Sequence, residues 1–125
     1  MRDDVQDLIN SAEEDLNAAK LLLNNHFLNS AAFHAQQATE KILKSFLLFK
    51  NNSYPFTHSI KLLLDKCTMI NHNFTEIHEA FLLDQYYTQT RYLPMLKLNF
   101  DDVKEAIEIA EKVINFVLNM FEKEK

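Results

Sequence analysis

The polar stretch with the clearest chemical potential is DQYYTQTRY, which begins at Asp84. On a helix, Asp84, Tyr87 and Arg91 share one face because they are spaced at i, i+3 and i+7. Arg91 and Arg2 are the only arginines in the chain. A guanidinium makes planar, two-pronged hydrogen bonds to a phosphate or a carboxylate, which lysine cannot do. The stretch therefore predicts a phosphate site, a Tyr-lined protein interface, or an internal ion pair from Arg91 to Glu40 or Asp84.

Metal ligation and nucleophilic catalysis lack their usual patterns. No two histidines are spaced at i,i+4 on one predicted helix, and none has the Glu-x-x-His spacing of di-iron bundles. The chain contains no glycine, which rules out the usual Gly-x-Ser-x-Gly turn and Gly-rich phosphate loops. A bound phosphate would need positive side chains or a helix N-terminus. We therefore expect no metal, no cofactor and no standard nucleophile.

Composition limits the class of protein. A chain of 125 residues can bury a core as one domain, spanning 1–125, without disulfides. With 13 Lys+Arg against 18 Asp+Glu, the net charge of −5 disfavours nonspecific nucleic-acid binding. The lone Cys67 excludes an internal disulfide and is expected to pack as a small apolar residue. The acidic start and the lack of a long apolar run predict a cytoplasmic protein without a membrane segment.

Apolar periodicity predicts an all-α, up-and-down bundle of about five helices. The absence of glycine favours long helices over the tight turns of a sheet. We expect helices at about 3–23, 31–49, 57–67, 75–90 and from 102 to the end, with a loop at 68–74. The central helix should have an apolar face and a polar face, the latter formed by His34, Gln37, Glu40, Lys41 and Lys44.

Capping residues define the expected helix ends. Without glycine, asparagine is the next choice for a left-handed C-cap, which predicts such caps at 24–25 and 51–52. Thr57 or Ser59 should cap the third helix, with His58 beside them as a neutral, hydrogen-bonding imidazole. Asp102 and Glu105 predict a capping box at the start of the last helix.

A second apolar line on the last helix consists of Ile109, Phe116 and Met120. One apolar stripe is enough to join a bundle, so this line predicts either a surface for another protein or a helix covered on two sides.

Three stretches together resemble the HEPN domain of prokaryotes: AAFHAQQATEKILKSFL, THSI and LDQYYTQTRY. The resemblance extends over nearly the whole chain and implies a bundle of about five helices that is commonly a homodimer. Such domains are often encoded beside a minimal nucleotidyltransferase and are linked to nucleotide or RNA chemistry. By position, the signature residues are Gln37, Glu40 and Lys41 in the central helix, His58 in the Thr-His stretch, and Arg91-Tyr92 in the Arg-Tyr-Pro stretch.

Two departures from this family pattern bear on activity. Leu93 interrupts Arg-Tyr-Pro, and no histidine follows Arg91, whereas ribonuclease members have a histidine after four to six intervening residues. Cleavage through a 2′-hydroxyl needs a proton acceptor and donor of near-neutral pKa, and a lysine such as Lys97 stays charged unless strongly desolvated. The resemblance therefore favours a non-catalytic protein that binds a nucleotide or serves a nucleotidyltransferase as its helical partner. The alternatives are a toxin-like ribonuclease of a toxin–antitoxin module, using His58 or His34, and a purely structural helical adaptor.

Overall fold

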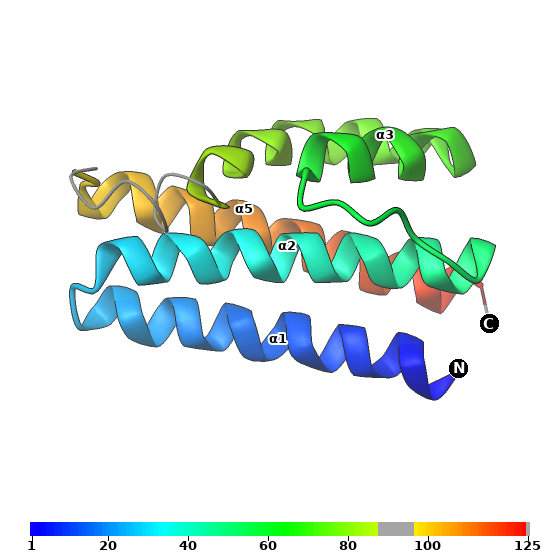
Figure 1. The fold of residues 1–125 in the computed structure, drawn as a ribbon, viewed down its shortest axis with the longest axis horizontal. Helices are drawn as coiled ribbons and strands as arrows, with labels where there is room; N and C mark the ends of the chain where they lie inside the picture. Colours follow the sequence, from blue (N-terminus) through cyan, green and yellow to red (C-terminus); the bar gives the residue numbers. More distant parts are fainter. Residues whose placement is uncertain (88–96, 125) are drawn as a thin grey trace.

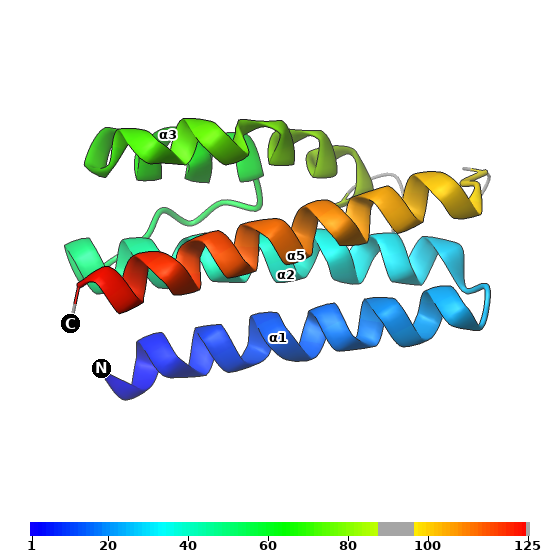
Figure 2. The same cartoon turned by 180° about the vertical axis from the view of Figure 1, so that it is seen from behind.

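In the computed structural model, which describes residues 1–87 and 97–124, three long helices pack against one another (Figure 1). They are α1 (Asp3–Asn24), α2 (Leu28–Asn51) and α5 (Phe100–Lys123). A shorter pair consists of α3 (Ile60–Ile70) and the 3-10 helix η1 (His72–Asp84). Both views place α2 and α5 in the middle, with α1 on one side and the α3–η1 pair on the other (Figure 2). The described residues contain no strand, so the predicted all-α bundle is confirmed.

The predicted left-handed C-cap is found at the end of α2, and at the end of α1 it lies one residue later than predicted. Asn52 takes the predicted left-handed conformation after α2, with φ 61°. After α1 the prediction was wrong, because Asn25 has φ −101° and the left-handed residue is His26, with φ 63°. The N–H of His26 bonds to the Leu23 carbonyl, and that of Phe27 to the Leu22 carbonyl. This Schellman pattern places the positive φ one residue later than the asparagine pair.

The segment after α3 departs from the prediction. The loop expected at 68–74 is absent, since α3 continues to Ile70 and η1 begins at His72. The helix expected from 75 is 3-10 as far as Asp84, and it is interrupted at Ile77, whose φ of −117° and ψ of 22° are not helical. Residues 85–87 are α-helical, and the predicted stretch 88–90 lies outside the described residues. The physical reason is a three-residue repeat: the buried side chains of η1 are Phe74, Ile77, Ala80 and Leu83. A helix with three residues per turn aligns them on one face.

The start of α5 is set by a different residue from the one expected. Its N-cap is Asn99, whose side chain accepts a hydrogen bond of 2.8 Å from the N–H of Asp102. Asp101 and Asp102 instead occupy the first turn, where negative charge complements the helix dipole. The predicted capping box at Asp102 was therefore wrong.

The second apolar line of α5 faces the rest of the bundle. The Phe116 ring lies 5.0 Å from that of Phe74 on η1, and Met120 is buried. Ile109 is partly buried against the core. The line is therefore packed against the bundle at Phe116 and Met120, while Ile109 and Phe116 stay partly exposed.

Cys67 is fully buried, as predicted, with its Sγ 3.9 Å from the carbonyl oxygen of Leu43. Burial raises the pKa of its thiol to about 12. Below that value the reactive thiolate is scarce in the folded state, so we expect no native alkylation at about pH 8. Iodoacetamide labelling followed by mass spectrometry should give a rate limited by unfolding. Labelling as fast in native buffer as in denaturant would contradict this burial.

No helix in the described part of the chain is both long and apolar enough to cross a membrane.

Candidate functional site

A row of polar side chains is buried along α2. Gln36, Glu40 and Lys44 follow one another at four-residue spacing, and they are 0%, 4% and 9% exposed. Lys44 Nζ donates to Glu40 Oε2 at 2.9 Å, and the same ammonium lies 5.3 Å from the centre of the Tyr54 ring. Glu40 and Lys44, two members of the predicted polar face of α2, are therefore buried rather than exposed. The chain between α2 and α3 runs back along α2 (Figure 1), and its residues Tyr54 and His58 contact this row.

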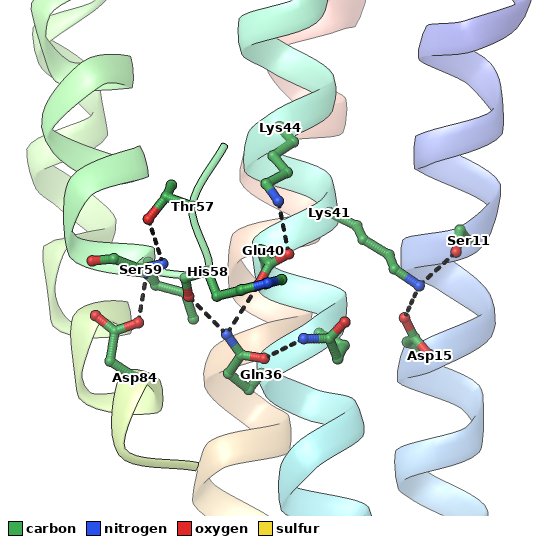
Figure 3. A network of polar contacts seen from close by, with 12 residues as sticks. Ser11, Asp15, Gln36, Glu40, Lys41, Lys44, Thr57, His58, Ser59 and Asp84 are labelled. Atoms are coloured by element: carbon green, nitrogen blue, oxygen red, sulfur yellow. Dashed lines mark hydrogen bonds and ion pairs between the residues drawn. The ribbon is translucent and has the colours of Figure 1, made fainter. Parts of the chain in front are cut away.

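His58 is held at two points by this row (Figure 3). Its Nδ1 lies 3.1 Å from Glu40 Oε1. Its main-chain carbonyl accepts a hydrogen bond of 3.2 Å from Gln36 Nε2, which also lies 3.4 Å from Glu40 Oε1. The His58 side chain remains 49% exposed, whereas that of Glu40 is 5% exposed. A buried carboxylate thus orients an imidazole that solvent reaches.

Tyr87 stacks on the imidazole of His58, with ring centres 4.4 Å apart and planes 15° from parallel. The Phe33 ring, from α2, lies 6.1 Å from that of Tyr87. An open hollow of about 320 Å³ is lined by His58, Ser59, Asp84 and Tyr87. This hollow therefore brings together residues from the Thr-His stretch and from the polar stretch that begins at Asp84.

Asp84 caps the start of α3 from outside that helix. Its two carboxylate oxygens accept from the backbone N–H groups of Ile60, at 2.6 Å, and Lys61, at 3.0 Å. Ser59 is the N-cap, as predicted, and its hydroxyl accepts from the Leu62 N–H at 3.1 Å. The exposed N–H groups of this helix start thus have internal acceptors, which ties η1 to α3 and fixes the edge of the hollow.

The other predicted site residues are separated from the hollow or lie outside the described chain. Lys41 extends the opposite way, toward α1, where its Nζ lies 2.7 Å from Asp15 and 2.8 Å from the Ser11 hydroxyl. Gln37 donates to Gln36 Oε1 at 2.7 Å and so supports the buried row. Arg91 and Tyr92 lie outside the described residues. The two carboxylates predicted as ion-pair partners of Arg91 have other partners in the structure. Glu40 bonds to Lys44 and His58. Asp84 accepts from the N–H groups at the start of α3.

Sequence reasoning missed Gln36 and gave Lys44 no role in the site. The signal was present in their four-residue spacing from Glu40, which places all three on one helix face. It was hidden because three consecutive polar turns on a helix usually mark a solvent-facing side.

A second hollow, of about 240 Å³, lies where the end of η1 meets the start of α5, and its lining includes Tyr86, Asp102 and Glu105. Burial raises the pKa of the Tyr86 hydroxyl, and the carboxylates of Asp102 and Glu105 raise it further. The negative charge disfavours an anionic ligand here. Within 1–87 and 97–124, no three His, Cys, Asp or Glu side chains are grouped so that they could hold a metal ion.

These features define a helical bundle with a histidine–tyrosine hollow, and the HEPN domain model matches residues 5–122. The chain belongs to the HEPN domain family. It is 28% identical to the TT1696 protein of Thermus thermophilus, with a TM-score of 0.84 over 94% of this chain and 98% of that one. It is also 28% identical to ST0689, an archaeal HEPN homologue, with a TM-score of 0.74 over 93% and 96% of the two chains. No curated protein gives a significant match.

Proposed function

We propose that this protein is a non-catalytic HEPN protein that binds a nucleotide at the His58–Tyr87 hollow and acts, as a homodimer, as the helical partner of a nucleotidyltransferase. The observation that carries nucleotide binding is the Tyr87 ring stacked on an oriented His58 beside an open hollow. Aromatic rings and imidazoles at a surface are suited to stacking on a base. Arg91, four residues beyond Tyr87 in the sequence, would supply the charge-assisted hydrogen bonds to phosphate.

Nucleotide binding is tested by calorimetry with ribonucleoside mono- and triphosphates. Hydrogen bonds to charged groups contribute about 1.5–3 kcal/mol, so Arg91→Ala should weaken binding by roughly tenfold to a hundredfold. The matched control is Arg2→Ala, which removes the other arginine, paired with Asp4 at 3.1 Å, and should leave affinity unchanged. If Arg91→Ala lowers only the melting temperature and leaves affinity intact, Arg91 is structural.

The partnership is tested separately by a tagged pull-down from the native host with mass spectrometry of the recovered proteins. We expect a nucleotidyltransferase together with a second copy of this chain. Recovery of the homodimer alone, from cells that express a nucleotidyltransferase, would instead favour a structural adaptor. An adaptor would contact other proteins through exposed apolar side chains such as Phe56 and Met69, which are 102% and 81% exposed.

One observation favours a second candidate function, a toxin-like ribonuclease. The pair of His58 and buried Glu40 is an imidazole oriented by a carboxylate, an arrangement that can accept a proton from a 2′-hydroxyl. Under this alternative, purified protein cleaves RNA, and both His58→Ala and Arg91→Ala abolish cleavage. An inactive wild-type protein would leave the non-catalytic function in place.

A further inference from the structure

The hydrogen bond between His58 and Glu40 determines which imidazole nitrogen carries a proton. Glu40 Oε2 accepts from Lys44, and Oε1 faces His58 Nδ1 at 3.1 Å. A carboxylate only accepts hydrogen bonds, so Nδ1 must be the donor. In a neutral imidazole the second nitrogen, Nε2, then keeps its lone pair and acts as an acceptor. Among the described residues, the hydrogen bonds of this imidazole involve Nδ1 alone.

The rest of the hollow is also rich in acceptors. Its described lining contains no lysine or arginine and does contain the Asp84 carboxylate. Each Asp84 oxygen accepts one hydrogen bond from the start of α3 and has further lone-pair capacity. A phosphate would find no cation in this lining, whereas a ligand that carries hydroxyl donors would find several acceptors. The part of a nucleotide with that chemistry is the ribose.

We infer that His58, held by Glu40, recognises a ribose hydroxyl and makes the hollow selective for ribonucleotides over 2′-deoxyribonucleotides. This inference rests on the nucleotide binding proposed above. The 2′-hydroxyl is the group that distinguishes the two classes, and it can donate to Nε2 while the base stacks on an aromatic ring. His58 is the specificity-determining residue, and Glu40 is a positioning residue that acts through it.

The test compares the four ribonucleoside monophosphates with their 2′-deoxy counterparts by calorimetry at about pH 8. Wild-type protein should bind the best ribonucleotide about tenfold more tightly than its deoxy form, since one hydrogen bond is lost. His58→Phe retains a ring against Tyr87 but no acceptor, so it should reduce the ratio to about one.

The matched control is His34→Phe. His34 also lies on a carboxylate, with Nδ1 2.9 Å from Asp15 Oδ1, but it does not line the hollow. The ribose preference should survive this change. Equal wild-type affinity for both nucleotide classes overturns the inference and leaves nucleotide binding standing. An absence of binding by either class overturns both.

The role of Glu40 is tested by Glu40→Gln, which preserves size. An amide can donate as well as accept, so it no longer selects one tautomer of His58. Long-range ¹H–¹⁵N spectra of the wild-type protein should show a protonated Nδ1 and an unprotonated Nε2, and Glu40→Gln should mix the two tautomers and lower the ribose preference. A wild-type spectrum with the proton on Nε2 would refute the positioning role.

Discussion

Glu40→Leu is expected to lower the free energy of unfolding by about 3–5 kcal/mol, because it leaves the charge of Lys44 buried without its carboxylate. Both side chains of this pair are nearly inaccessible, at 5% and 11% exposure. The substitution also removes the acceptor for His58 Nδ1. The Tyr54 ring, 5.3 Å from Lys44 Nζ, offers only partial compensation. Urea denaturation followed by circular dichroism measures the loss.

A second ion pair with the same helical spacing provides the control. Lys61 and Asp65 pair at 3.1 Å with side chains 59% and 49% exposed. Because exposed pairs contribute little, Asp65→Leu should change stability by no more than about 0.5 kcal/mol. Adding Lys44→Met to Glu40→Leu should recover much of the loss, because the uncompensated charge is gone. If the double variant is no more stable than Glu40→Leu alone, burial of an unpaired charge is not the cause.

Phe46→Ala is the other large expected effect, a loss of about 3–5 kcal/mol in the free energy of unfolding. The Phe46 side chain is 1% exposed, and its ring centre lies 4.7 Å from that of Phe74 and 6.3 Å from that of Phe121. It therefore joins α2 to both η1 and α5. Truncation leaves a cavity where these three helices meet. The same urea titration, performed with unchanged buffer, reports this loss.

Phe56→Ala is the matched control for that truncation. Phe56 is 102% exposed, so its removal creates no cavity and should alter stability by no more than about 0.5 kcal/mol. Comparable losses for the two variants would mean that Phe46 is not a core residue.

Much of the fold follows from periodicity along the chain. The apolar stripe of α1 that begins at Val5 recurs at helical spacing in the sequence, and the structure buries its six residues. Caps at Ser59 and Asn52 were also predictable, since local side-chain and backbone chemistry defines them. The 3-10 geometry of η1 was not predicted, because a three-residue apolar repeat also fits one face of an α-helix over a short stretch.

The candidate site was predictable by residue but not by arrangement. Glu40, His58, Asp84 and Tyr87 were chosen from motifs, yet nothing local indicates that Glu40 is buried or that it meets His58. Lys41, one position from Glu40, faces α1 instead, because successive helical residues point about 100° apart.

The sequence by itself determined the helical class, the membership of the HEPN family and the residue types available for chemistry, because these depend on neighbours within a few turns. Only the tertiary structure decided that the chain between α2 and α3 folds back over α2. That contact joins residues 18 positions apart, pairing a buried carboxylate with a half-exposed imidazole. The contact depends on how α2, α3 and the chain between them pack in space. Helical periodicity contains no information about contacts between residues so far apart in the sequence.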